Sequence, residues 1–406
     1  MIPSSSTARQ DAWLLWPLAA IHFYHLLDLL MLQPLAPQLM SQLALSSGQF
    51  ASLVTAYALC AAVGGLIAAL FIDRVERKRL LLCLFALFSL MTLLCGLASD
   101  YGVLLLARGV SGLAGGMLSA MVQTLIGDLI PPERRGRATG LMMSMFSLAS
   151  ILGVPLALWL SELGGWRLPF VLLATLALPC ALVAAWRLPR RPPMPQAKLS
   201  HPLAMWGRIL APRRHRAALL FVCCGVFSGA CVMPFLAIYL TQALQVSSGL
   251  LSWVYLLGGA ATLLASRWVG GWSDRVGKPQ AFLRLAGLSL LPITLITQLP
   301  PLPWYGLLLA TTLFFLLVPC RSVPAVALVT SSVDPALRGG FLAMNASCQQ
   351  LATAAGATVA GQLVQVSEQG VSGYGYAGLL GGLATLAAMV LCLRIPPLPR
   401  AEPSTA

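Results

Sequence analysis

Long apolar stretches fill most of the chain and restrict it to a membrane fold. Of its 406 residues, 58% are hydrophobic and only 9% are charged, whereas charged residues make up about a quarter of a soluble globular protein. A helix needs about 20 apolar residues to cross the hydrocarbon core of a bilayer. The stretches of this length predict an all-α membrane protein with twelve transmembrane helices, near residues 12–39, 48–71, 80–98, 101–129, 138–161, 168–187, 217–241, 249–271, 281–299, 304–330, 340–363 and 374–394.

Basic side chains concentrate in alternate loops of this topology. The formal net charge is +14, and clusters within residues 74–79, 134–137 and 187–216 fall on one side of the membrane, whereas Arg167 is the main basic residue on the other side. Cytoplasmic loops carry the excess of Lys and Arg. We therefore expect both termini in the cytoplasm and a chain embedded in the lipid bilayer. Since the basic residues form no single patch, we expect no nucleic-acid partner.

Two landmarks occur twice at nearly the same offset. The first is an acidic and basic pair after the second and the eighth stretch, at Asp73, Arg74, Asp274 and Arg275. The second is an acidic residue followed by an Arg-Gly pair, at Asp128, Arg135, Asp334 and Arg338. Such duplication is typical of transporters built from repeated halves. It predicts two six-helix bundles, residues 1–187 and 217–406, joined by a basic, proline-rich cytoplasmic linker at residues 188–216.

The repeated loop also carries a family signature. From Gly270, the second copy continues to Asp274-Arg275-Val-Gly277-Lys278 and resembles the G-x-x-x-D-R-x-G-R-K motif of the major facilitator superfamily. The first copy has Ala69 and Glu76 at the two positions where the motif has glycine. The resemblance covers essentially the whole chain and implies the major facilitator fold, in which this turn helps to hold the cytoplasmic side shut. It implies a cytoplasmic gate, with a basic turn that only fixes orientation as the alternative, at Asp73, Arg74, Arg77, Asp274, Arg275, Lys278, Arg135 and Arg338.

Two further motifs point to one branch of that family. Arg108, followed by Gly112 and Gly116, is similar to the arginine and glycine motif of proton-coupled members. Gly153-Val-Pro155 resembles the drug:proton antiporter branch and its arabinose-efflux-like relatives, which implies export. Small residues at these positions let helices approach closely, either to slide during transport or simply to pack.

Asp28 is the acidic residue placed well inside a predicted span, where a carboxylate is costly unless it is paired, protonated or exposed to a water-filled cavity. At about 1.5 Å per residue, Asp28 and Arg108 reach compatible depths. Burial favours the protonated carboxyl and a nearby Arg favours the ionised form. We therefore hypothesise that Asp28 carries the coupling proton and that Arg108 modulates it. A static ion pair is the alternative. His25, on the same helix face as Asp28, is a relay, a substrate contact or a packed side chain.

The substrate cavity is expected at the bilayer midplane between the halves. Arg321 stands between Pro319 and Pro324, where proline can break a helix and free carbonyl groups toward a cavity. Arg321 then either contacts an anionic substrate group or reaches toward the cytoplasmic face. The candidate cavity residues are Tyr24, Tyr57, Gln123, Tyr239, Arg321, Asn345 and Gln349.

These observations predict a proton-coupled transporter that exports small drug-like or metabolite-like molecules by alternating access, with no enzyme activity. No nucleotide-binding loop is present in the sequence, so we expect a proton gradient as the energy source and no cofactor. The cysteines include no C-x-x-C pair, so no metal site is expected. We also expect a monomer, and an inner bacterial membrane because Arg greatly outnumbers Lys. Proton-driven uptake, lipid handling and a transport-inactive receptor or scaffold remain as alternatives.

Overall fold

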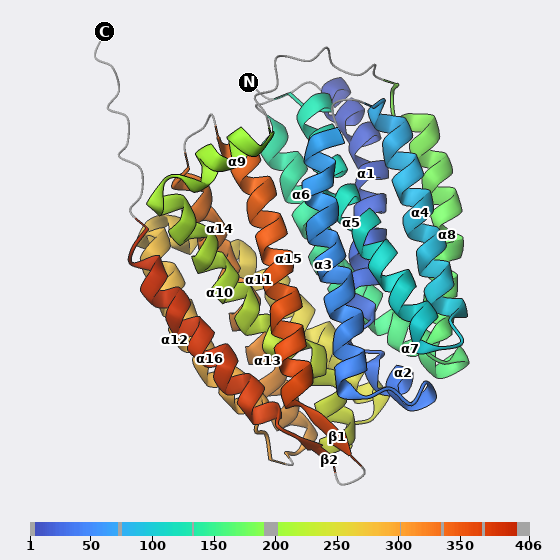
Figure 1. Cartoon of the computed structure of the whole chain (residues 1–406), viewed down its shortest axis with the longest axis vertical. Coiled ribbons are helices and arrows are strands. Elements are labelled where there is room, and N and C mark those ends of the chain that lie inside the picture. Colours follow the sequence, from blue (N-terminus) through green and yellow to red (C-terminus); the bar gives the residue numbers. More distant parts are fainter. Residues whose placement is uncertain are drawn as a thin grey trace.

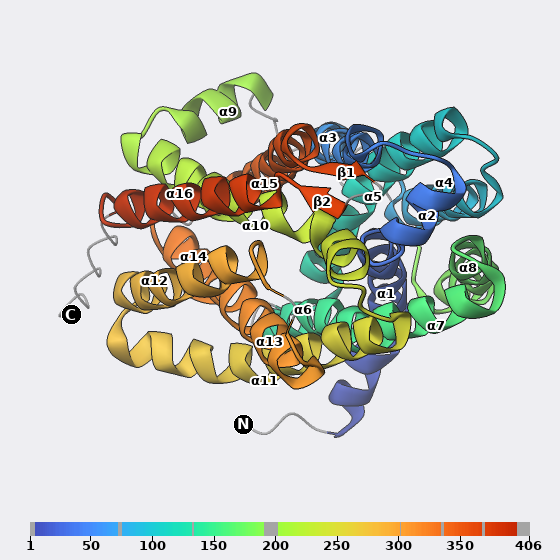
Figure 2. The same ribbon diagram turned by 90° about the horizontal axis from the view of Figure 1, so that it is seen from below.

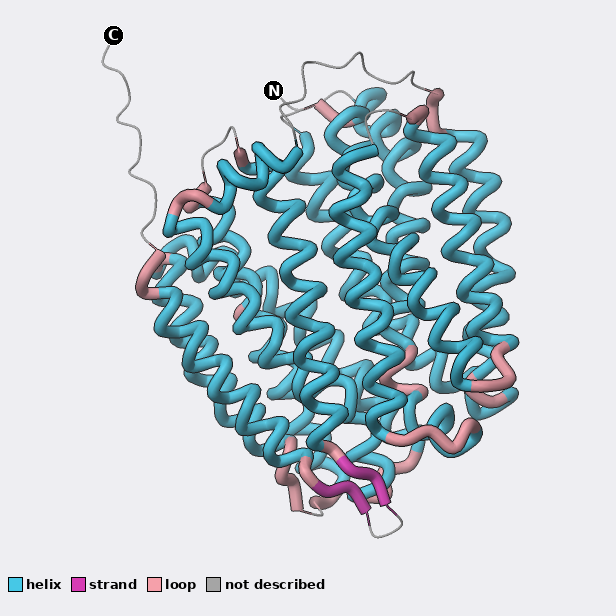
Figure 3. The backbone as a smooth tube through the Cα atoms, in the orientation of Figure 1, coloured by secondary structure: helices cyan, strands magenta, loops and turns pink. Residues whose placement is uncertain are grey.

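The computed structural model describes residues 5–71, 75–131, 134–190, 202–300, 302–333, 337–367 and 370–395, and these are almost entirely helical (Figures 1 and 3). Within them, the one pair of strands is an antiparallel hairpin of β1 (Gln365–Ser367) and β2 (Gly370–Ser372), in which Val366 faces Val371. The expected all-α membrane fold is confirmed.

The first half of the chain forms a bundle whose helices match the first six predicted spans. The first span divides into two helices, and a π-helical turn interrupts the fifth. The elements are α1 (Ser5–Met31), α2 (Ala36–Gln42), α3 (Ser47–Phe71), α4 (Arg77–Leu97), α5 (Tyr101–Leu129), α6 (Arg135–Leu148), η2 (Ala149–Gly153), α7 (Val154–Gly164) and α8 (Arg167–Arg187).

The second half repeats this pattern after a short helix, α9, in the predicted linker. Its fourth span also divides in two. The elements are α9 (Pro202–Leu210), α10 (Arg213–Ile238), η3 (Tyr239–Ala243), α11 (Ser248–Val276), α12 (Lys278–Ile296), α13 (Trp304–Cys320), α14 (Ser322–Ser331), α15 (Arg338–Leu363) and α16 (Tyr374–Cys392).

Eleven helical segments of the described chain are long and apolar enough to cross a membrane. The eleventh of the twelve expected spans, residues 340–363, does form a helix, α15, but it lies outside that group. Its sequence is rich in Ala, Gly, Asn, Gln and Thr, because α15 packs between α3 and α10. A helix that contacts protein on several sides does not need the continuous apolar surface that lipid requires.

The two groups of helices lie side by side and meet along two seams (Figures 1 and 2). In one seam α15 runs along α3, and Thr55 and Thr358 share a hydrogen bond of 2.9 Å. In the other seam α11 packs against α6, η2 and α7. The β-hairpin and α2 lie at one end of the molecule, here named the hairpin face. At the opposite end, the α9 face, α1 begins and α16 ends (Figure 1).

Glycines on α5 allow a very close crossing with α3. A Cβ atom at Gly112 would collide with the backbone of Tyr57, and one at Gly116 would collide with the backbone of Ala61. The crossing therefore depends on the missing side chains. It brings Tyr57 of α3 directly against the face of α5 that also carries Arg108.

Candidate functional site

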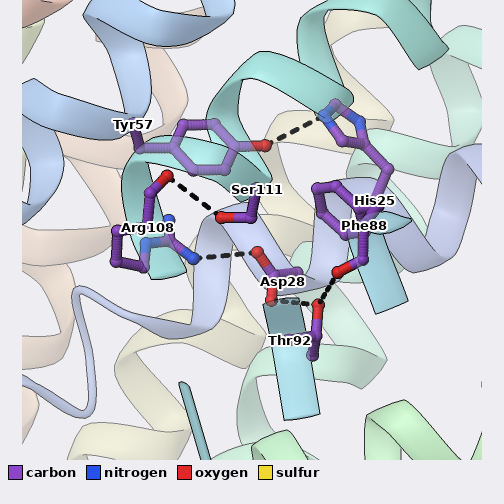
Figure 4. Close-up of polar contacts among 7 residues, drawn as sticks. All are labelled: His25, Asp28, Tyr57, Phe88, Thr92, Arg108 and Ser111. Carbon is purple, nitrogen blue, oxygen red and sulfur yellow. Dashed lines mark hydrogen bonds and ion pairs between the residues drawn. The ribbon is translucent and has the colours of Figure 1, made fainter. Parts of the chain in front are cut away.

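Asp28 of α1 and Arg108 of α5 form an ion pair inside the first bundle (Figure 4). The distance from Arg108 Nη1 to Asp28 Oδ2 is 2.8 Å, and the two residues are 1% and 0% exposed. Thr92 of α4 donates a hydrogen bond of 3.0 Å to Asp28 Oδ1. Both carboxylate oxygens are therefore held, and three helices meet at one buried charge pair. The depth match expected for Asp28 and Arg108 is present, whereas their part in proton coupling stays a prediction.

Tyr57 extends this polar cluster on the other side of Arg108 (Figure 4). The Arg108 guanidinium carbon lies 4.3 Å from the centre of the Tyr57 ring, which is within cation–π range. The Tyr57 hydroxyl shares a hydrogen bond of 3.0 Å with Nε2 of His25. Gly115 makes this bond possible, because a Cβ atom there would lie 2.8 Å from both the Tyr57 hydroxyl and His25 Nε2.

The cluster is continuous from His25 through Tyr57 and Arg108 to Asp28. A buried ion pair gains little net stability, because desolvation offsets the attraction between its charges. If α1 moved away from α5, an isolated carboxylate in this apolar site would be costly, and a proton would relieve the cost. In this arrangement, the Asp28 carboxylate can be neutralised either by the Arg108 cation or, when the helices separate, by a bound proton.

Arg321 is the second deeply buried arginine, and its surroundings differ. It stands at the break between α13 and α14, so the helix break expected from Pro319 and Pro324 is confirmed. The residue is 3% exposed. Its guanidinium donates hydrogen bonds of 2.8–3.1 Å to oxygens of three helices, α10, α12 and α16. All four acceptors are neutral: the hydroxyls of Ser289, Thr385 and Ser228 and the carbonyl of Gly225.

A cavity of about 280 Å³ adjoins Arg321 in the second bundle. Most of its wall is apolar and comes from α10 and from the broken α13–α14 pair. Polar groups enter it from Gln33, in the turn between α1 and α2, and from Gln349 and Thr353 of α15. Of the seven predicted cavity residues, Arg321 and Gln349 line this cavity.

The other predicted cavity residues lie elsewhere. Tyr57 belongs to the ion-pair cluster, and Tyr24 packs edge-on against Phe85 at 5.0 Å. Tyr239 donates a hydrogen bond of 2.9 Å to the carbonyl of Leu299 and so joins helix ends at the hairpin face. Asn345 is buried, and among the described residues its Oδ1 has no hydrogen-bond partner. Gln123 is exposed on α5.

Three of the predicted gate residues have partners within their own bundle. Arg77 pairs with Asp128 between α4 and α5. Arg135 donates to the carbonyls of Ile130 and Gly127, in the chain just before it. Lys278 donates to the carbonyl of Ala327 at 3.4 Å. Each of these contacts therefore lies within a single bundle.

The remaining gate residues are exposed or lie outside the described part. Asp274 and Arg275 are exposed at the end of α11. Asp73, Arg74 and the side chain of Arg338 fall outside what the structure describes. The proposed gating role therefore stays a prediction.

The motif at the fifth span marks a local change of helix type. Gly153 ends the π-helical turn η2, and Pro155 stands in the first turn of α7, where its missing N–H is tolerated. A Cβ atom at Gly153 would lie 2.5 Å from Leu27 Cδ1 of α1. The glycine therefore keeps the π turn close to α1, one residue before Asp28.

The sequence analysis missed the hydroxyl partners of the two buried charges. Thr92, Ser289 and Thr385 gave no signal, since single Thr and Ser residues are common in helix packing. For Ser228 the sequence did contain a signal. Ser228 lies 200 positions after Asp28, and this distance is close to the 201 positions between the repeated residues Asp73 and Asp274. The internal repeat therefore pointed to Ser228.

Comparison with known proteins agrees with this architecture. The family model of the Major Facilitator Superfamily matches residues 18–230 and 218–406. The uncharacterized MFS-type transporter YbcL of Bacillus subtilis is 23% identical over 391 residues, which are 95% of this chain and 97% of that protein. A probable sugar efflux transporter of Helicobacter acinonychis is 28% identical over 261 residues, 64% of this chain and 65% of that protein.

Solved structures share the fold at low sequence identity. A bacterial homologue of the human lysosomal transporter Spinster, in an inward-facing and unoccupied conformation, has a TM-score of 0.72 at 18% identity and covers 95% of each chain. Since the family model matches nearly every described helix, the chain belongs to the major facilitator superfamily and is a membrane transporter rather than an enzyme.

Proposed function

We propose that this transporter exports small molecules in exchange for protons, and that Asp28 carries the proton. The observation that supports this proposal most directly is the buried pair of Asp28 and Arg108, whose side chains are 0% and 1% exposed. A carboxylate at such a position is rare in membrane helices and usually marks an ion or proton pathway. Both charges face the inside of the bundle, where lipid does not reach them.

The ion pair connects proton binding to helix movement. Asp28 is on α1 and Arg108 is on α5, so any rocking that changes the distance between these helices changes the partner available to the carboxylate. Protonation then favours the separated arrangement and deprotonation favours the paired one. His25 and Tyr57 form the adjoining hydrogen bond, which offers a route by which a proton reaches or leaves the pair.

The position of the cavity agrees with alternating access. Gln33 approaches it from the hairpin side, whereas Phe282 and Val326 line it closer to the α9 face. The positive-inside pattern assigns the α9 face, with the basic linker, to the cytoplasm. In this assignment, the cavity wall extends from Gln33 on the outer side to Phe282 and Val326 on the cytoplasmic side.

The export direction rests on the antiporter-like motif at Gly153 and Pro155 and on the Helicobacter relatives that are named as probable sugar efflux transporters. The superfamily includes both importers and exporters, so the direction of transport is decided by measurement. Accumulation of substrate inside intact cells would indicate uptake instead.

The test is substrate-triggered proton movement in everted membrane vesicles. Sugars, lipophilic drugs and organic anions are added to energised vesicles, and the dissipation of the pH gradient is followed with a fluorescent dye. Asp28→Asn is expected to abolish the response. The matched control is Asp100→Asn, the same substitution at an exposed carboxylate that caps α5, and it should respond like the wild type.

Two results would refute the proposal. A full proton response from folded Asp28→Asn would reduce Asp28 and Arg108 to a static ion pair. Substrate flux that never moves protons, in the wild type as well, would mean that another gradient drives the transporter.

A further inference from the structure

Each bundle holds a deeply buried arginine in its fourth span, but the two charges have different surroundings. Arg108 lies on the fourth span of the first bundle, and Arg321 lies in the fourth span of the second. Asp28 on α1 corresponds to Ser228 on α10, since the 200 positions between them nearly equal the offset of the repeated loops. Arg108 thus faces a carboxylate, whereas Arg321 faces a hydroxyl at the equivalent position.

Arg321 therefore keeps a positive charge without a counter-charge among the described residues. All its hydrogen-bond acceptors are neutral oxygens, at 2.8–3.1 Å. Hydrogen bonds orient the guanidinium, but they leave its net charge in place. A buried charge is normally paired with an opposite charge, and no described residue supplies an anionic partner for Arg321.

The cavity next to Arg321 provides the room for the missing anion. Its volume of about 280 Å³ is just below the usual range of ligand pockets, which begins near 300 Å³, and suits a small ligand. Val222, Val226 and Met233 give the α10 wall an apolar surface, and Gln349 and Thr353 provide polar groups opposite. A wall of this kind suits an organic body, while the guanidinium suits a carboxylate or phosphate.

We propose that the cavity binds a small amphipathic organic anion, with its carboxylate or phosphate ester group against Arg321 and its apolar part against α10. This inference rests on the proposed transport function, because it names the class of substrate that the cavity accepts. Arg321 supplies the charge recognition, and the hydroxyls of Ser228 and Thr385 hold the guanidinium at the edge of the cavity. Neutral and cationic molecules of the same size bind weakly, since they leave the buried charge uncompensated.

The first experiment compares probes on the wild-type protein in lipid nanodiscs, with binding measured by calorimetry. Octanoate and octyl phosphate are expected to bind at least about tenfold more tightly than octanol or octyltrimethylammonium. Inorganic phosphate should bind much more weakly than octyl phosphate, since it lacks the apolar part. Equal binding of the anionic and neutral octyl probes, or equal binding of the two phosphates, would overturn the proposal.

The second experiment supplies the missing counter-charge from the protein itself. Ser228→Asp places a carboxylate beside Arg321, as Asp28 stands beside Arg108, and should lower the affinity for octyl phosphate by about tenfold relative to Ser228→Asn. The asparagine variant has nearly the same size without the charge, so the ratio of the two affinities reports the charge alone. Resistance to unfolding by SDS in each variant shows whether the fold is retained. Equal affinities in two folded variants would reduce Arg321 to a structural hydrogen-bonding centre that holds α10, α12 and α16 around the helix break.

These measurements use no pH gradient, so they separate the inference from the proposed proton coupling. Anion-selective binding that Ser228→Asp weakens, together with an absence of substrate-driven proton movement, would retain the binding site and refute the coupling. Proton movement that depends on Asp28, triggered equally by neutral and anionic substrates, would retain the coupling and refute the anion site.

Discussion

Removing Asp28 alone should destabilise the protein more than removing both members of the Asp28–Arg108 pair. Asp28→Asn leaves the Arg108 guanidinium fully buried with only the Tyr57 ring and neutral acceptors near it. An uncompensated buried charge of this kind costs about 3–5 kcal/mol, and the cation–π contact offsets about 0.5–2 kcal/mol of a cation's burial. We therefore expect Asp28→Asn to lower the free energy of unfolding by about 2–4 kcal/mol.

The opposite substitution should cost less. Arg108→Gln leaves a carboxyl group that can take up a proton, and Thr92 remains as its hydrogen-bond partner. The expected loss is about 1–2 kcal/mol, close to that of a missing buried hydrogen bond, and it should grow as the pH rises and protonation becomes harder. The double variant buries two neutral amides, so its loss should be similar to that of Arg108→Gln alone.

The assay is equilibrium unfolding in mixed dodecyl maltoside and SDS micelles, followed by tryptophan fluorescence for the wild type, both single variants and the double variant. A coupling energy of about 2 kcal/mol or more is expected from the cycle. Additive losses would show that the two side chains do not interact in the folded protein. Such a result would remove the physical basis for proton exchange at Asp28.

Three smaller predictions concern helix packing and helix ends. Gly115→Ala adds a methyl group 2.8 Å from His25 Nε2 and the Tyr57 hydroxyl, and it should destabilise the protein by about 1–3 kcal/mol. The control Gly127→Ala, on the same helix with nothing within 4 Å, should be neutral or slightly stabilising. Equal effects of the two substitutions on unfolding in micelles would contradict the packing argument. The backbone N–H of Val103 at the start of α5 holds the pKa of Asp100 below its ordinary value. The stability that this carboxylate contributes is therefore complete above the unfolded-state pKa and is lost as the pH falls through the lower folded-state pKa. Asp100→Asn caps the helix without titrating, so it should show a shallower loss of stability below about pH 4, and a pH profile identical to that of the wild type would argue against the cap. Asp128→Asn removes the partner of Arg77 and should destabilise the protein by about 1–3 kcal/mol. The double variant Arg77→Asp with Asp128→Arg exchanges the two charges and should recover part of that loss. A double variant no more stable than Asp128→Asn would mean that the pair contributes little.

The features that the sequence predicted correctly depend on quantities that a single helix determines. Apolar length placed the spans, and the proline pair placed the break at Arg321. Constant helical rise matched the depths of Asp28 and Arg108 although they are 80 residues apart. Each of these predictions needs only the position along one helix, which a sequence states directly.

The features that it missed depend on how helices are rotated against one another. Thr92 reaches Asp28 because α4 is rotated so that this face points toward α1, and the sequence of α4 does not state that rotation. Gln123 was expected in the cavity but is exposed, because depth alone does not state which way a side chain points. The charge asymmetry at Ser228 likewise became visible only when Arg321 was seen to donate to it.

The two buried arginines together predict how membrane voltage should act on transport. Exchange of one proton moving inward for one monoanion moving outward transfers two positive charges inward per cycle. With the cell interior negative, each charge is worth about 2.3 kcal/mol per 100 mV, so the potential contributes about 4.6 kcal/mol to export of an anion. Export of a neutral molecule against one proton gains only half of this. In proteoliposomes, a potassium gradient with valinomycin should therefore drive the monoanion octanoate across the membrane without a pH gradient, and Ser228→Asp should suppress that flux. Anion flux that ignores the imposed potential would exclude this exchange, because no electroneutral combination of one proton inward and one monoanion outward exists.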